Sequence, residues 1–154
     1  RLGSGIAPIR AMLDAGVPVA LGVDGAASND SSQVLLEARQ ALLFQRVQHG
    51  VDGMGAREAL WLATRGGAAV LGWERCGQLA PGYRADLVLW DLSGLAALGA
   101  WDPVAALVMC AGLRPRDVFI EGKAVVENRH LRGIDVADIN RRAQQSLDHL
   151  RQVG

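Results

Sequence analysis

The sequence has few of the residues on which several protein classes depend. Its 154 residues include two cysteines, Cys76 and Cys110, which is too few for a disulfide framework, and they show no CxxC spacing. Lys123 is the single lysine, and sixteen basic residues balance sixteen acidic ones. This neutral balance gives no electrostatic footprint for nucleic acid or an anionic membrane. No apolar run approaches the roughly 20 residues of a membrane span. We therefore expect a cytoplasmic protein without nucleic-acid or membrane partners.

The start of the sequence lacks two further features. It begins with Arg1 rather than Met, and no basic-then-apolar signal segment follows. Half of the residues are hydrophobic, which is enough for a packed core. We therefore expect a folded piece of a longer protein.

The first half of the sequence combines helical patterns with one strand-like run. Apolar spacing predicts helices over residues 6–15, 33–48 and 56–71, with Gly16 just past the end of the first. Residues 17–23, VPVALGV, are continuously apolar, which is typical of a strand buried on both faces of a parallel sheet. One such strand needs partner strands that this chain does not supply. The pattern therefore predicts the last segment of an α/β barrel or of an open α/β sheet.

The second half of the sequence has a different, β-rich pattern. We expect a strand over 85–91, two strands over 117–121 and 124–127 around a tight Gly122-Lys123 turn, and an amphipathic helix over 135–152. A short helix over 102–110 should begin at Asp102, with Pro103 in its first position. We expect the four tryptophans to pack in cores.

Asp24 is the strongest candidate for a functional residue. It follows the apolar run 17–23 and precedes glycine and a polar loop, AASNDSS, over residues 26–32. In α/β barrels, catalytic side chains project from this end of the strands. Two structural alternatives stay open: a hairpin turn at Asp24-Gly25, or a carboxylate that only hydrogen-bonds its own loop. At least one of Ser28, Asn29 and Asp30 is expected to cap the following helix.

The histidines and serines give no support for other kinds of site. His49, His130 and His149 share no HxH, HxxH or HExxH spacing, so each is expected at the surface rather than on a metal. No serine stands in a GxSxG setting, which leaves nucleophilic serine chemistry without support.

Several segments resemble the metal-dependent amidohydrolases. LGSGIAPIRAMLDAGVPVALGVDGAASND, residues 2–30, resembles the end of their barrel, and REALWLATRGGAAVLG, residues 57–72, resembles the helix that leaves it. GQLAPGYRADLVLWDL, DPVAALV and VFIEGKAVVEN are similar to the family's small β-sandwich and are unspecific for substrate. The stretch around VDGAASND is more specific within the family. It resembles the branch that holds 8-oxoguanine deaminases, triazine hydrolases and S-adenosylhomocysteine deaminases.

The resemblance implies an α/β fold with three parts. Residues 1–71 would form the C-terminal end of a (β/α)8 barrel, 72–134 part of a small β-sandwich domain, and 135–154 a C-terminal amphipathic helix. The resemblance also implies one divalent metal, either zinc or, in its place, iron or another divalent ion. Asp24 would be both a ligand of this metal and a catalytic residue. A carboxylate beside a metal-bound water would accept its proton and pass it to departing ammonia.

The sequence departs from the family pattern because it has no HxH pair, no further ligand histidines and no matching glutamate. We expect these to lie upstream in a parent enzyme, so that this chain alone is inactive. The resemblance implies that the parent is a homo-oligomeric hydrolase of non-peptide C–N bonds. It would deaminate a small heterocycle, a purine or triazine ring, and 8-oxoguanine is the first substrate that the resemblance suggests. Alternatives are a dechlorinating or N-dealkylating triazine hydrolase, an S-adenosylhomocysteine deaminase, or a truncated packing module without activity.

A lone barrel strand would also leave backbone edges and apolar surface uncovered, so we expect the isolated chain to self-associate or to be poorly soluble.

Overall fold

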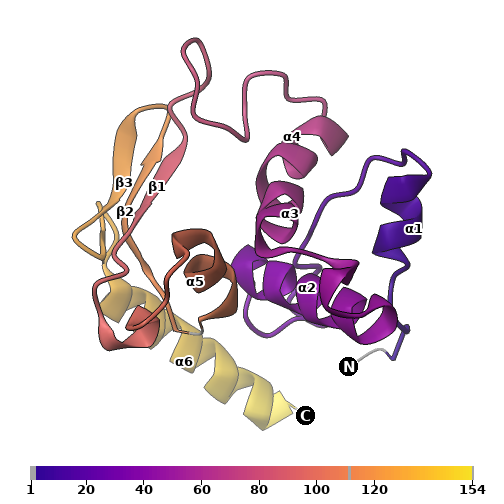
Figure 1. Cartoon of the computed structure of the whole chain (residues 1–154). Helices are drawn as coiled ribbons and strands as arrows, with labels where there is room; N and C mark the ends of the chain where they lie inside the picture. Colours follow the sequence, from indigo (N-terminus) through magenta and orange to yellow (C-terminus); the bar gives the residue numbers. More distant parts are fainter. Residues whose placement is uncertain (1–2, 111, 154) are drawn as a thin grey trace. The chain divides into compact units, whose positions relative to one another are not determined.

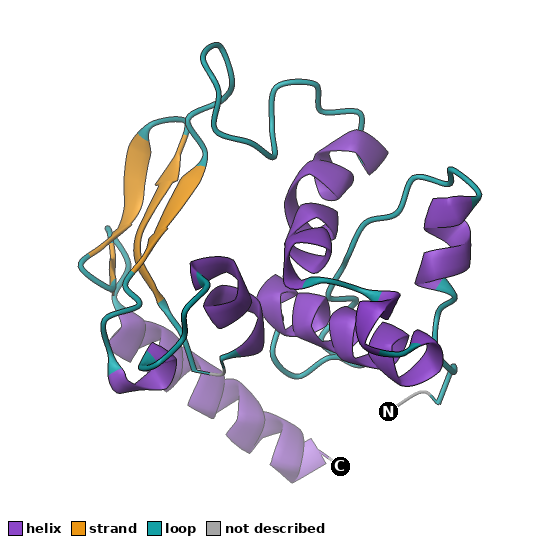
Figure 2. Cartoon of the chain, in the orientation of Figure 1, coloured by secondary structure: helices purple, strands orange, loops and turns teal. Residues whose placement is uncertain are grey.

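A helical unit and a β-sheet unit make up the chain, and the computed structural model describes residues 3–110 and 112–153 (Figures 1 and 2). The helical unit covers Arg1–Arg84 and Asp91–Leu113, and the sheet unit covers Ala85–Trp90 and Arg114–Gly154. The sheet unit thus begins at Ala85, and residues 91–113 belong to the helical unit. Among the described residues, no helix is both long and apolar enough to cross a membrane.

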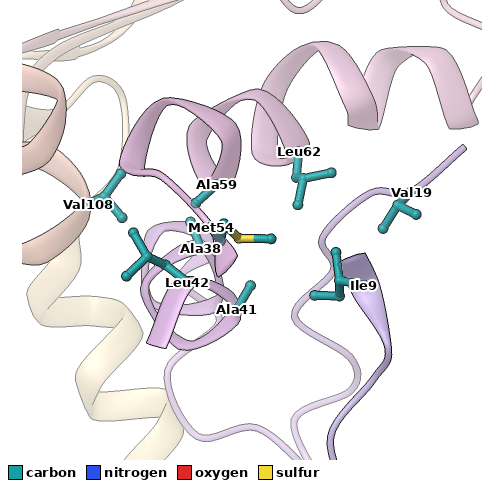
Figure 3. Close-up of a cluster of buried hydrophobic side chains, with 9 residues drawn as sticks. All are labelled: Ile9, Val19, Ala38, Ala41, Leu42, Met54, Ala59, Leu62 and Val108. Carbon is teal, nitrogen blue, oxygen red and sulfur yellow. The ribbon is translucent and has the colours of Figure 1, made fainter. Parts of the chain in front are cut away.

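Helix α2, Val34–His49, lies at the centre of the helical unit's core. Its Ala38 and Leu42 have no exposed surface, and Leu62 is equally buried (Figure 3). Burying a leucine side chain of this kind stabilises the fold by about 1.5–3 kcal/mol. Phe44 and Val47 on the same helix are 45% and 80% exposed. Neighbouring elements therefore cover this helix on one side only.

Helix α1, Ile9–Asp14, is shorter than the predicted 6–15 because Pro8 disfavours helical backbone at the residue before it. Gly16, at φ +72°, ends the helix as expected, and its N–H donates to the Leu13 carbonyl at 2.9 Å. The fully buried Gln45 of α2 holds the start of α1. Its amide donates to the Ala7 carbonyl at 2.9 Å and accepts from the Arg10 N–H at 3.0 Å.

The predicted strand over 17–23 is not formed, and these residues have no regular secondary structure. The reason is that a strand needs a hydrogen-bonding neighbour, and the described residues offer this segment none. The segment still contributes to the core through Val19, which is 8% exposed, whereas Val17 is 43% exposed. The prediction of a strand here is therefore wrong for this chain, although the burial of Val19 is as expected.

The predicted helix over 56–71 is present but contains a π-helical turn. It runs as α3, Ala56–Trp61, the π-turn η2, Leu62–Gly66, and α4, Gly67–Val70. Thr64 donates its hydroxyl to the Leu60 carbonyl at 2.8 Å, a bond that competes with the helical backbone pattern. Gly66 is buried, and a Cβ there would lie 2.7 Å from the Val19 carbonyl oxygen. This close approach brings η2 against the segment that leads to Asp24.

Helix α5, Pro103–Met109, begins as the sequence predicts. The Asp102 carboxylate accepts a hydrogen bond from the Val104 N–H at 2.8 Å, and Pro103 occupies the first helical position. The tryptophan prediction is wrong for three residues of this unit: Trp61 is 41% exposed, Trp73 is 57% exposed and Trp101 is 100% exposed. Aromatic type alone does not report whether a neighbouring element is present to cover the ring.

The second unit contains one antiparallel sheet in the order β1-β2-β3-β4, with bounds Leu87–Trp90, Pro115–Ile120, Lys123–Glu127 and His130–Leu131. The β2–β3 turn is Glu121-Gly122, one residue before the predicted Gly122-Lys123, and both turn residues have positive φ. The short strand β4 was not predicted. It follows a second turn of the same kind at Asn128-Arg129.

Helix α6, Val136–Val153, confirms the predicted amphipathic helix at the end of the chain. The Asp135 carboxylate caps it, accepting hydrogen bonds from the N–H groups of Ala137 and Asp138 at 2.9 and 3.2 Å. Its apolar side chains are largely exposed, at 42% for Ile139 and 66% for Leu150.

Candidate active-site loop

Asp24 opens the loop that joins the 17–23 segment to α2, residues 24–33, which we call the Asp24 loop. Its carboxylate accepts two hydrogen bonds, one from the Gly25 N–H at 2.8 Å and one from the Ser28 hydroxyl at 2.6 Å. The side chain is exposed, and the backbone of Asp24 is left-handed, with φ +61°. A left-handed residue with a Cβ is uncommon and needs contacts that hold it. The hydrogen bonds from Gly25 and Ser28 are such contacts.

The turn after Asp24 is not a hairpin. The Gly25 carbonyl accepts from the N–H groups of both Ser28 and Asn29 at 3.0 Å, so the backbone coils as in one turn of a helix. No return strand follows, and the chain continues into α2. The structure therefore removes the hairpin alternative and shows a carboxylate tied to its own loop, which is compatible with a structural and with a catalytic role.

The hydrogen bonds at Asp24 keep its carboxylate charged. The hydrogen bond from the Ser28 hydroxyl has the largest effect and the one from the Gly25 N–H the next largest, and both lower the pKa of Asp24 below its ordinary value of 3.8. Desolvation raises this pKa, but by less. At neutral pH the group is therefore an anion in contact with solvent. Such a group accepts protons and binds cations.

Asn29 does not cap α2, in contrast to the expectation that a residue of this loop would do so. The residue before the helix is Gln33, which makes no side-chain capping bond. The Asn29 side-chain oxygen instead accepts from the Ser31 N–H at 2.9 Å, and its amide nitrogen donates to Glu37 at 2.7 Å. Sequence reasoning missed Glu37, because an acidic residue in a first helical turn signals only a favourable charge at the helix end.

The three histidines do not gather into a site. His49 ends α2, His130 opens β4 and His149 lies on α6, and all three are exposed, as expected. Within residues 3–110 and 112–153, no group of three or more His, Cys, Asp or Glu side chains could hold a metal ion. The described residues thus hold no complete metal site, and Asp24 is the ligand candidate that the sequence indicates.

An open, mainly apolar hollow of about 370 Å³ lies beside the 17–23 segment. Its walls come from α1, α2 and the segment itself, and include Ile9, Met12, Val19, Leu21 and Phe44. An open apolar surface of this kind suits packing against a further element of the fold.

Comparison with known proteins identifies the family. Residues 1–125 match the amidohydrolase family. The chain belongs to the amidohydrolases. This amidohydrolase chain is 46% identical over 137 residues to the 8-oxoguanine deaminase of Pseudomonas aeruginosa, a match that covers 89% of this chain and 30% of that protein.

Two solved structures have closely similar folds. An adenosine deaminase from Xanthomonas campestris with bound zinc is 35% identical, with a TM-score of 0.93 over 98% of this chain and 35% of that one. An atrazine chlorohydrolase from Arthrobacter aurescens, complexed with zinc, is 36% identical, with a TM-score of 0.87 over 94% of this chain and 33% of that one. The chain spans about a third of the length of these proteins.

Proposed function

We propose that this chain forms the C-terminal part of a metal-dependent aminohydrolase, which replaces a ring amino group of a small heterocycle by oxygen and releases ammonia. The leading substrate is 8-oxoguanine. The observation that carries the proposal is the charged, solvent-facing Asp24 directly after the apolar 17–23 segment, in a chain 46% identical to an 8-oxoguanine deaminase. In this proposal residues 1–71 belong to a (β/α)8 barrel, 72–134 to a small β-sandwich domain and 135–154 to the terminal helix.

Asp24 acts as a proton carrier in this reaction. Its carboxylate accepts a proton from the attacking water as the carbon–oxygen bond forms, and delivers it to the amino group as the carbon–nitrogen bond breaks. A carboxylate held by Gly25 and Ser28 keeps one orientation through both transfers. Its lowered pKa ensures that it begins the cycle deprotonated.

Asp24 also fits the part of one metal ligand, since hard divalent cations and zinc both bind carboxylate oxygen. The described residues supply no group of three or more possible ligands, so we propose that the remaining ligands come from residues outside this chain. A divalent metal, most simply zinc, would lower the pKa of a bound water far below that of free water, towards about 7. A zinc-bound adenosine deaminase and a zinc-bound atrazine chlorohydrolase among the similar structures support this choice of metal.

A second candidate reaction is hydrolysis of a triazine ring with loss of chloride or an alkylamine. The similarity to the atrazine chlorohydrolase, with a TM-score of 0.87, favours it. The two reactions share the attack of water on a ring carbon and differ in the leaving group. Ammonia and an alkylamine each need a proton to leave, whereas chloride does not, so Asp24 has a second proton-transfer role in both amine-releasing reactions and none in dechlorination.

The proposal is tested by a chimera in which this chain replaces the matching segment of the Pseudomonas aeruginosa 8-oxoguanine deaminase. Ammonia release from 8-oxoguanine and metal content are measured together, with the unaltered host as reference. We expect a metal-loaded chimera that releases ammonia. A folded, metal-loaded chimera without turnover would refute the role of this chain in catalysis.

Substrate identity is tested on the parent protein that carries this chain. Guanine, 8-oxoguanine, S-adenosylhomocysteine and hydroxytriazines are supplied in parallel, and ammonia, alkylamine and chloride are each quantified. Preferred release of ammonia from 8-oxoguanine supports the leading proposal. Preferred release of chloride or alkylamine from a triazine would replace it with the second candidate.

A further inference from the structure

A continuous chain of hydrogen bonds connects Asp24 to helix α2. The Ser28 hydroxyl donates to the Asp24 carboxylate at 2.6 Å, and the N–H groups of Ser28 and Asn29 both donate to the Gly25 carbonyl. Asn29 then donates from its side-chain amide to the Glu37 carboxylate at 2.7 Å. Glu37 lies 13 positions from Asp24 in the sequence and makes no direct bond to it.

Asn29 is the junction of this network because both ends of its side chain are used. While its nitrogen donates to Glu37, its oxygen accepts from the N–H groups of Ser31 and Ser32 at 2.9 and 3.4 Å. Ser32 is left-handed, with φ +49°, as is Asp24 at the other end of the loop. Two unfavourable backbone conformations therefore flank a single side chain that bonds to both the loop and the helix.

Glu37 provides a fixed point for the loop. It stands in the first turn of α2, directly before Ala38, which has no exposed surface. A hydrogen bond to a carboxylate is stronger than one between neutral groups. Site residues are held most accurately when their supports are attached to a rigid element.

We propose that Glu37 is a positioning residue for Asp24 and acts through Asn29 and Ser28. The inference rests on the proposed function for its catalytic consequence, but the structural link itself does not depend on that function. Without the Asn29–Glu37 bond, the loop loses its attachment to α2, and the Asp24 carboxylate loses its fixed orientation. Small displacements of a catalytic group lower the rate of the chemical step more than substrate binding.

A simpler role for Glu37 is also testable. An acidic side chain in a first helical turn stabilises the helix through its charge. Glu37→Gln removes that charge but keeps an oxygen that accepts from Asn29. Glu37→Ala removes both. The positioning role predicts that glutamine substitutes for glutamate, and the charge role predicts that glutamine is as harmful as alanine.

The first measurement is amide hydrogen exchange in the 154-residue chain. Glu37→Ala should speed exchange at the N–H groups of Ser28 and Ser31 by about tenfold or more, the factor that one bond to a charged group is worth. Glu37→Gln should stay within about threefold of the unaltered chain, because its oxygen keeps the bond to Asn29. Exchange that is unchanged by Glu37→Ala, or equally fast in both variants, would overturn the proposal.

The second measurement is turnover in the chimera with the 8-oxoguanine deaminase. We expect Glu37→Ala to lower kcat by about 10- to 100-fold with KM nearly unchanged, and Glu37→Gln to restore it. A matching loss of thermal stability and kcat in both variants would overturn the positioning role. If the chimera with Glu37 intact is inactive, the proposed function fails, and hydrogen exchange still decides whether Glu37 holds the loop.

Discussion

Replacing Gly66 by alanine tests the contact that places the 17–23 segment against η2. A Cβ at this position would lie 2.7 Å from the Val19 carbonyl oxygen and 3.2 Å from a ring carbon of Trp61, whereas ordinary contacts begin at 3.4 Å. The backbone of the segment must therefore move by several tenths of an ångström. Gly67 is the matched control, because the nearest atom to a Cβ there is the Leu62 carbonyl oxygen at 3.9 Å.

The comparison of the two variants isolates the steric cost. Gly66 and Gly67 both have helical backbone, with φ −59° and −58°, so each substitution gains the same helix propensity of about 1 kcal/mol. Overpacking at Gly66 costs about 1–3 kcal/mol, and Gly67→Ala has no such cost. Taking about 2 kcal/mol as the difference, and about 2–4 °C per kcal/mol for a chain of this size, Gly66→Ala should melt about 4–8 °C below Gly67→Ala.

The assay is thermal and urea unfolding of the two variants, followed by far-ultraviolet circular dichroism. The expected order of stability is Gly67→Ala above the unaltered chain and Gly66→Ala below it. Equal stability of the two variants would refute the close packing of η2 on the segment that leads to Asp24.

Three further predictions concern stability and association. Gln45→Met should lower the free energy of unfolding by about 2–4 kcal/mol, because the Ala7 carbonyl and the Arg10 N–H both lose a buried partner. Urea titration measures this free energy, and an unchanged urea midpoint would contradict the prediction. Hydrogen bonds from the Asn128 N–H and, next, from Arg116 lower the pKa of Asp117. The stability that the Asp117 carboxylate contributes is therefore present above its unfolded pKa of about 4 and is lost as the pH falls through the folded pKa. Asp117→Asn should flatten this acid dependence of the thermal midpoint, and a pH profile that the substitution leaves unaltered would count against the prediction. Finally, light scattering of the isolated chain should show self-association through its exposed apolar side chains, and a monodisperse monomer would disprove that expectation.

Local sequence signals predicted the helices and the sheet well. The caps at Gly16 and Asp102 act through their own backbone and neighbours, so the residue type was sufficient to place them. The helix 33–48 and the hairpin strands were each placed within one or two residues, apart from a turn displaced to Glu121-Gly122. These features depend on contacts within a few residues of sequence.

Features that depend on distant partners were predicted poorly. The apolar pattern of 17–23 predicts a buried strand, but of these residues only Val19 is buried, and a strand requires a neighbour that the described chain does not provide. Trp101 is fully exposed for the same reason, since nothing in its local sequence reports the lack of a covering element. The place of Asp24 after an apolar segment and before a polar loop is enough to indicate it as the candidate site. Its support by Glu37 was missed, because a side-chain bond across eight residues leaves no periodic signal.

The most direct test of the central claim is the effect of Asp24→Asn on turnover in the chimera with the 8-oxoguanine deaminase, measured beside metal content and thermal midpoint. Asparagine keeps the size of the side chain and one coordinating oxygen, but it loses the charge and the basicity. We predict a loss of turnover of at least about 10²–10⁴-fold, the usual contribution of general acid–base catalysis, with little change in the thermal midpoint. Near-normal turnover would remove Asp24 from the mechanism, and loss of activity together with unfolding would show instead that its carboxylate serves only to hold the Asp24 loop.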